Sequence, residues 1–126
     1  MKIEHIAIYY KDLEKAKDFF SEYFGASAGQ LYRNEKTGFS SYFLTFEDGA
    51  RLEIMNRPDV CEKENSPLGG LHHIAFSVGS REKVDEFTDR LRRDGFSVTG
   101  EPRVTGDGYY ESIISDHEGN LIEITV

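Results

Sequence analysis

The feature that most constrains this chain is an internal repeat. Residues 3–8 read IEHIAI and residues 71–76 read LHHIAF, so a His-Ile-Ala triplet returns after 68 residues. Further along, DGARLEIM at 48–55 matches EGNLIEIT at 118–125 with an offset of 70. Two landmarks that recur in the same order at nearly the same spacing indicate that the chain consists of two similar halves.

The repeat divides the 126 residues into two modules, at about 1–56 and 71–126. The segment between them, about 57–70, is rich in Pro, Gly and charged residues and is predicted to be a linker. One module alone would bury too little surface to be comfortably stable, so we expect residues 1–126 to form a single domain.

Both modules show the same order of predicted elements, namely a strand, a helix and three further strands. The predicted strands are 2–10, 29–34, 39–46 and 50–55 in the first module and 71–78, 96–99, 108–115 and 120–126 in the second. A helix follows the first strand of each module, with Asp12 and Ser80 as N-caps and Gly25 and Gly95 at the ends. The predicted fold class is therefore α+β, with two tandem βαβββ modules.

The alternation of side chains along these strands sorts them onto two faces. His5 and His73, on the first strands, lie opposite the apolar residues that face the helices, as do Glu53 and Glu123 on the last strands. Two imidazoles and two carboxylates at repeat-equivalent positions form a ligand set that suits one divalent metal per site, such as Ni, Co, Zn, Mn or Fe. A sheet that curves would bring the four together.

Composition excludes several classes of partner and compartment. The 15 Lys and Arg stand against 23 Asp and Glu, and a net charge of −8 makes nucleic acid a poor partner. No apolar run approaches the roughly 18 residues that a membrane helix needs, so we expect no membrane partner. The start, MKIEHIAIYY, has no signal-peptide pattern, and the expected compartment is the cytoplasm. The single cysteine, Cys61, cannot form an internal disulfide and is predicted to be a free thiol.

At these residues the chain resembles the vicinal oxygen chelate superfamily, which includes glyoxalase I, extradiol dioxygenases, fosfomycin- and bleomycin-resistance proteins and methylmalonyl-CoA epimerase. The resemblance covers nearly the whole chain and is carried by EHIAIYYKDLEKAKDFFSEYFG, DGARLEIM, LHHIAFSV and DHEGNLIEITV. Taken as a whole, the sequence resembles short bacterial proteins described as glyoxalase or lactoylglutathione lyase. The resemblance implies an open, curved mixed sheet around a metal pocket, and a homodimer, since small members usually pair.

The order of the four ligands separates the branches of this superfamily. Glyoxalase I-like members use His, Glu, His and Glu, which His5, Glu53, His73 and Glu123 match. The resemblance therefore implies a metal-dependent lyase or isomerase whose substrate is the hemithioacetal of an α-ketoaldehyde such as methylglyoxal. Glu123 is the expected proton-transferring base, with Glu53 as its symmetric partner.

Two positions depart from the glyoxalase I pattern. That enzyme commonly has Arg four residues after the first His and Asn four residues after the first Glu, where this chain has Tyr9 and Arg57. The sequence therefore does not identify the thiol that forms the hemithioacetal, because another thiol fits as well as glutathione. Tyr9 and Arg57, together with Arg103 and Tyr109 from a predicted loop over 101–110, form the expected substrate pocket.

Three alternatives stay open beside the glyoxalase interpretation. A drug- or metabolite-binding module of the bleomycin-resistance kind would not need four ligands. A dioxygenase, or a thiol transferase related to fosfomycin resistance, uses two His and one Glu. The second carboxylate, at Glu53, is the residue that distinguishes these classes.

Overall fold

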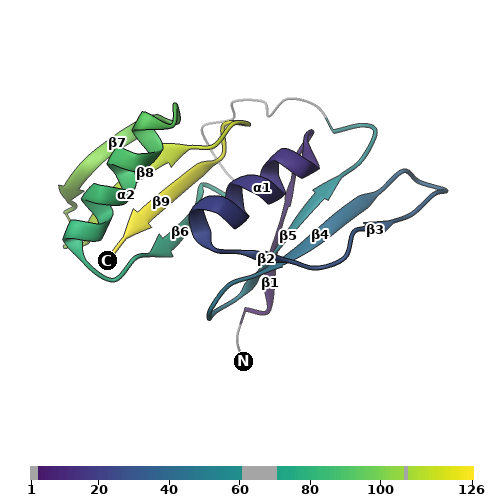
Figure 1. The fold of residues 1–126 in the computed structure, drawn as a ribbon, viewed down its shortest axis with the longest axis horizontal. Coiled ribbons are helices and arrows are strands. Elements are labelled where there is room, and N and C mark those ends of the chain that lie inside the picture. The colour runs from purple at the N-terminus through teal and green to yellow at the C-terminus, as the bar shows by residue number, and fades with distance from the viewer. Residues whose placement is uncertain (1–2, 61–70, 107) are drawn as a thin grey trace. The chain divides into compact units, whose positions relative to one another are not determined.

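The computed structural model describes residues 3–60, 71–106 and 108–126. The chain separates into two compact units, Met1–Glu62 and Lys63–Val126, called module 1 and module 2 here (Figure 1). Most of the predicted linker, including Cys61, lies outside the described residues. Within the described residues, neither helix has the length and apolar character needed to cross a membrane.

Module 1 contains one helix and a mixed sheet. Its elements are β1 (His5–Tyr9), α1 (Leu13–Phe24), β2 (Ser27–Ala28), β3 (Tyr32–Arg33), β4 (Ser40–Thr45) and β5 (Arg51–Asn56) (Figure 1). The strand order is β1-β5-β4-β2, and β3 also pairs with β4. The first and last strands pair in parallel, with His5 opposite Arg51, and the other pairs are antiparallel.

Module 2 repeats this arrangement. Its elements are β6 (His73–Ser77), α2 (Arg81–Arg93), β7 (Ser97–Val104), β8 (Tyr110–Ser115) and β9 (Leu121–Thr125). The strand order is β6-β9-β8-β7, and β6 pairs with β9 in parallel, with His73 opposite Leu121. The α+β prediction and the two tandem modules are confirmed. The described residues form two sheets, one in each module. A metal pocket shared by the two modules stays a prediction.

Both helices begin after the predicted N-caps and α1 ends at the predicted Gly25, whereas α2 has Asp94 as its C-cap, one residue before the predicted Gly95. The Asp12 side chain accepts a hydrogen bond from the backbone N–H of Lys15 at 2.9 Å, and Gly25 ends α1 in the left-handed region with φ 65°. Ser80 caps α2 in the same way, through the backbone N–H of Lys83. Side-chain oxygens that satisfy the free N–H groups of the first turn stabilise a helix by about 1 kcal/mol.

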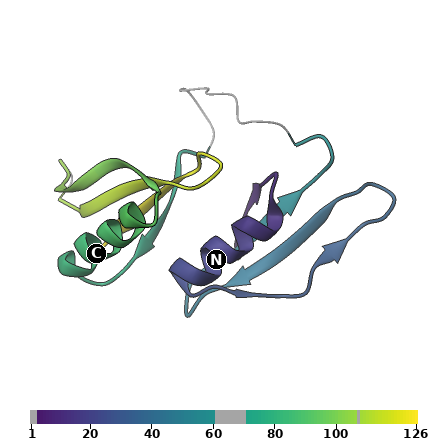
Figure 2. The ribbon, with the colours of Figure 1, turned by 45° about the horizontal axis from the view of Figure 1, so that its top comes forward.

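The core of each module lies between its helix and one face of its sheet, which Figure 2 shows from a second direction. Helix α1 buries Leu13, Ala16, Phe19 and Phe20, and α2 buries Val84, Thr88 and Leu91. The sheets contribute Leu52 and Ile54 in module 1 and Ile114, Ile122 and Ile124 in module 2. Alternate residues of β5 and β9 are only half-buried, so the predicted division of faces is confirmed.

Two strand predictions are wrong in detail, and both errors arise from irregular pairing. Of the predicted strand 29–34 only Tyr32–Arg33 is a strand, β3, while β2 lies just before this range at Ser27–Ala28, and the pairing with β4 slips by one residue between Ala28 and Tyr32. The predicted loop over 101–110 begins too early, since β7 continues to Val104 through register shifts around Gly100. This strand lies at the sheet edge, where Pro102 is tolerated because its missing N–H removes no central hydrogen bond.

Candidate functional site

His73 and Glu123 form a close pair in module 2. They lie on neighbouring parallel strands, where Ala75 is opposite Glu123 and His73 precedes Ala75 on the same face. His73 Nε2 lies 3.4 Å from Glu123 Oε2, and the Glu123 side chain is only 12% exposed. The imidazole and the carboxylate of the predicted ligand set that belong to this module therefore lie close together.

The equivalent residues of module 1 share a face but have a different arrangement. Ala7 is opposite Glu53, and His5 precedes Ala7 on the same face of β1. The His5 ring lies edge-on to Phe43, with ring centroids 5.3 Å apart. Its Nδ1 atom lies 2.5 Å from Glu4 Oε2, so His5 is paired with its chain neighbour.

Glu4 is held by two partners and had no role in the sequence analysis. The side chain of Arg51 pairs with the Glu4 carboxylate and stacks over the Phe43 ring, 4.2 Å from its centroid. Hydrogen bonds from His5 and then from Arg51 hold the pKa of the Glu4 carboxyl below its usual value. Glu4 therefore stays ionised next to the imidazole at neutral pH.

The residue before each predicted histidine ligand contacts that ligand's Nδ1 atom. His72, the repeat equivalent of Glu4, lies with its Nδ1 atom 2.9 Å from His73 Nδ1. Metal-binding histidines usually donate one ring N–H to a neighbouring group, which fixes the ring and leaves the other nitrogen for the metal. In both modules this pattern leaves Nε2 available. Polar residues directly before both repeated histidines were the signal that would have identified Glu4 and His72.

The donor set fits a divalent metal in chemistry and, in module 2, in spacing. Bonds of about 2.1 Å at angles of 90–109° separate two donor atoms by about 3.0–3.4 Å. The 3.4 Å between His73 Nε2 and Glu123 Oε2 lies at the upper end of this range. Among the described residues no group of three or more His, Cys, Asp or Glu side chains forms such a site. Each module contributes one His and one Glu to the predicted ligand set, so a site with all four ligands would need both modules.

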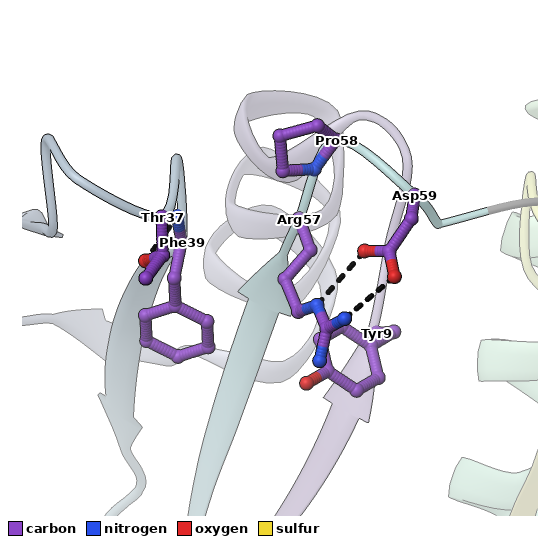
Figure 3. Close-up of a pocket in the computed structure, with 6 residues that line it drawn as sticks. All are labelled: Tyr9, Thr37, Phe39, Arg57, Pro58 and Asp59. Atoms are coloured by element: carbon purple, nitrogen blue, oxygen red, sulfur yellow. Dashed lines mark hydrogen bonds and ion pairs between the residues drawn. The ribbon is translucent and has the colours of Figure 1, made fainter.

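A pocket of about 510 Å³ lies in module 1 at the carboxyl ends of β1 and β5 (Figure 3). Its lining residues are Tyr9, Thr37, Phe39, Arg57, Pro58 and Asp59. Two of the predicted substrate-pocket residues, Tyr9 and Arg57, lie together because β1 and β5 pair in parallel, which puts the carboxyl ends of both strands at the same edge of the sheet. Asp59 was not predicted, and it pairs with Arg57 through two hydrogen bonds.

Arg103 and Tyr109 belong to module 2, whereas the residues that line this pocket all belong to module 1. Arg103 belongs to strand β7 rather than to a loop, and its Nη2 atom lies 3.4 Å from Glu111 Oε1. The Tyr109 side chain is exposed, and its carbonyl accepts a hydrogen bond from the Thr105 N–H. Their place in a substrate pocket stays a prediction.

Both a family model and individual proteins of known sequence are similar to this chain over most of its length. A sequence model of the Glyoxalase/Bleomycin resistance protein/Dioxygenase superfamily matches residues 2–124. The fosfomycin resistance protein FosX of Listeria monocytogenes is 32% identical, over 97% of this chain and 86% of its own length. The ethylmalonyl-CoA/methylmalonyl-CoA epimerase of Cereibacter sphaeroides is 28% identical, over 98% and 96%. A protein named probable lactoylglutathione lyase from Vibrio cholerae is 27% identical, over 98% and 88%.

A shorter match and the solved structures agree with these relatives. The uncharacterized protein YwkD of Bacillus subtilis is 35% identical over 65% of each chain, so this chain spans just under two thirds of that relative. The glyoxalase family protein from Enterococcus faecalis has a TM-score of 0.82 at 24% identity, over 99% of this chain and 97% of that chain. Likeness at this identity establishes a common fold.

Proposed function

Because the chain belongs to the Glyoxalase/Bleomycin resistance protein/Dioxygenase superfamily, we propose that it is a metal-dependent lyase or isomerase of the glyoxalase I type. Its substrate would be the hemithioacetal of an α-ketoaldehyde such as methylglyoxal, formed with a thiol that stays open. The observation that carries the proposal is the 3.4 Å approach of His73 and Glu123, whose repeat equivalents His5 and Glu53 share a face of module 1.

The proposed ligands of one divalent metal are His5, Glu53, His73 and Glu123. When bound, such a metal supplies Lewis-acid stabilisation of negative charge on substrate oxygens. His5 and His73 would bind through Nε2, since Glu4 and His72 engage the Nδ1 atoms. Holding each ring in this way would leave its Nε2 atom for the metal.

Glu123 is the proposed base. Its carboxylate would take a proton from a carbon next to the carbonyl and return it to the adjacent carbon, which is general acid–base catalysis within one substrate. The side chain is 12% exposed, so bulk water has limited access to the proton in transit. Glu53 is its symmetric counterpart, and either carboxylate would serve a substrate bound in the matching orientation.

A second candidate is epimerisation at a carbon next to a thioester carbonyl. The epimerase relative spans nearly the whole chain and supports this candidate. It needs the same removal and return of a proton, so the same Glu residues would act. The second carboxylate of the donor set disfavours a dioxygenase or a thiol transferase, and the polar set as a whole disfavours a drug-binding module. The proposed assembly is a homodimer in the cytoplasm.

The test measures turnover with defined metals and substrates. Protein purified without chelator should hold about one divalent ion per site. Methylglyoxal with each of several thiols, and separately methylmalonyl-CoA in D₂O, should be assayed with Ni, Co, Zn and Mn in turn. Turnover of a hemithioacetal supports the first candidate, and exchange on methylmalonyl-CoA alone supports the second. Absence of turnover and exchange in every combination of substrate, thiol and metal would contradict both candidate functions.

A matched pair of variants tests the base. Glu123→Gln keeps the shape of the side chain but removes its basicity, and turnover should fall by about 10²–10⁴-fold. Glu86→Gln makes the same change on the exposed face of α2 in the same module and should leave turnover unchanged. Full activity in Glu123→Gln would exclude it as the base.

A further inference from the structure

Phe43 is an aromatic residue on the same face of the module 1 sheet as the proposed ligands His5 and Glu53. It lies on β4 opposite Glu53 of β5, and the neighbour of Glu53 on the other side, Ala7 of β1, is small. Strands two places apart in a sheet are separated by about 9.5 Å. The centroids of the His5 and Phe43 rings are only 5.3 Å apart. Both side chains therefore reach toward each other across β5.

The contact between the two rings has the geometry that aromatic pairs favour. Their planes meet at 85°, so one ring presents its edge to the face of the other. Perpendicular pairs attract each other because the positive edge of one ring meets the negative face of the other. The His5 side chain is 40% exposed, so solvent leaves it room to turn. A contact of this kind limits that movement.

The Phe43 ring has a second partner. The Arg51 guanidinium lies over it, with the Cζ atom 4.2 Å from the ring centroid, which is a favourable place for a cation. Arg51 Nε donates a hydrogen bond to Glu4 at 2.7 Å, and Glu4 in turn contacts Nδ1 of His5. The four side chains thus form a closed chain of contacts. In it Glu4 holds one atom of the His5 ring, and Phe43 restricts the plane of that ring.

Module 2 makes the same two contacts with different residues. Ile113 has the register position that Phe43 has in module 1, and it carries no ring. His73 instead has the His72 ring perpendicular to its own, with centroids 5.2 Å apart and planes at 82°. The same His72 contacts the Nδ1 atom of His73. One residue of module 2 thus supplies both contacts, which in module 1 come from Glu4 and Phe43.

We propose that Phe43 is a positioning residue for His5, which it restricts to the ring orientation that leaves Nε2 available to a metal. A hydrogen bond at Nδ1 fixes one atom but lets the ring pivot about that bond, and a perpendicular ring opposes this second movement. The inference rests on the proposed function in one respect, that His5 is a metal ligand. Apparent affinity falls with the fraction of protein in the binding-competent conformation, so a loose His5 ring weakens metal binding.

The first test measures the mobility of the His5 ring in metal-free protein. Its readout is the ¹³C relaxation order parameter of the His5 ring C–H bonds, with the His73 ring in the same sample as an internal reference. Phe43→Leu should lower the His5 order parameter from the range of rigid groups to below about 0.6, the range of flexible ones, and leave that of His73 unchanged. Phe43→Met, which also lacks a ring, replaces Phe43→Leu if that variant does not fold.

The second test measures metal affinity by chelator competition with Zn²⁺. Phe43→Leu should lower the affinity about two- to tenfold, the range expected when one aromatic pair is lost. Phe43→Tyr keeps the ring and should stay within about twofold of the wild type. Tyr32→Leu is the matched control, because it removes an exposed ring from β3 of the same sheet, and it should change neither readout.

Three results would overturn the assignment. A His5 order parameter that is the same in Phe43→Leu as in the wild type would show that Phe43 does not hold the ring. Equal losses of affinity in Phe43→Leu and Phe43→Tyr would show that the ring contact is not the cause. Unchanged affinity with a mobile ring would show that the orientation does not matter to the metal.

Failure of this inference differs from failure of the proposed function. Each of the three results can occur while the glyoxalase proposal holds. Wild-type protein that binds no divalent metal contradicts the glyoxalase proposal instead, and the measurement on metal-free protein still decides whether Phe43 restricts the His5 ring.

Discussion

A pair of buried hydroxyls fastens α2 to the sheet of module 2, and its energetics can be worked out from its geometry. Thr88 Oγ1 lies 2.6 Å from the Val84 carbonyl oxygen and 2.6 Å from Ser112 Oγ. Thr88 and Ser112 are both fully buried. The single hydroxyl hydrogen of Thr88 goes to the Val84 carbonyl, so the Ser112 hydroxyl must donate to Thr88.

This order of donation predicts an asymmetric response to mutation. Thr88→Val keeps the shape but leaves the Ser112 hydroxyl buried without its acceptor, which costs about 1–3 kcal/mol. Ser112→Ala removes only the donor, while Thr88 keeps the Val84 carbonyl, and costs about 0.5–1.5 kcal/mol. In the double variant no hydroxyl is left buried without a partner, so we expect it to be at least as stable as Thr88→Val alone.

Urea denaturation of the three variants and the wild type, followed by far-UV circular dichroism, measures these differences. With a urea dependence of about 1–3 kcal/mol per molar, Thr88→Val should lower the midpoint by roughly 1 M. The coupling between the two sites should be about 1 kcal/mol, in favour of the double variant. Losses that add without coupling, or a Thr88→Val protein as stable as the wild type, would refute the hydrogen-bond assignment.

Two further predictions concern the carboxylates of module 1. Glu4→Ala removes the carboxylate at the Nδ1 atom of the neighbouring histidine, and metal affinity in a chelator competition should fall about tenfold. Arg51→Gln removes only the other partner of Glu4 and should change affinity less than about twofold, so equal losses would contradict a role in orienting the ligand. Hydrogen bonds from Lys17 and Tyr42 lower the pKa of Glu14 from its ordinary 4.5. The stabilisation that these bonds give the folded protein is therefore complete above pH 4.5, and it is lost as the pH falls through the lowered pKa. Tyr42→Phe should therefore destabilise less in acid than at pH 6 by urea denaturation, and an equal effect at both would count against this bond.

Local patterns were enough to predict the features that depend on neighbouring residues. The helix boundaries follow from Asp12 and Gly25, because capping groups act within one turn. The shared face of His73 and Glu123 follows from the alternation of two strands, which parallel pairing then places side by side. The meeting of Tyr9 and Arg57 follows from the same pairing in module 1.

Other features depend on contacts that periodicity does not encode. The slip between Ala28 and Tyr32 is set by how the chain fits against β4, not by its own alternation. Alternation gives the face on which His5 lies but not its rotamer, which Glu4 determines. Asp59 stood in a predicted linker, where charged residues are usually solvated, and only the geometry of Arg57 identifies it as a partner.

The parallel closure of each module has a consequence for the order of events during synthesis. Among the strands of module 1, β1 is synthesised first, yet its sheet partner in the described part of the chain is β5, roughly 45 residues later. At ordinary translation rates of about 5–20 residues per second, β1 waits some 2–9 s for its partner. The hairpin of β4 and β5 can form before then, since its strands are adjacent in sequence. Folding of the nascent module therefore ends with the segment that was made first.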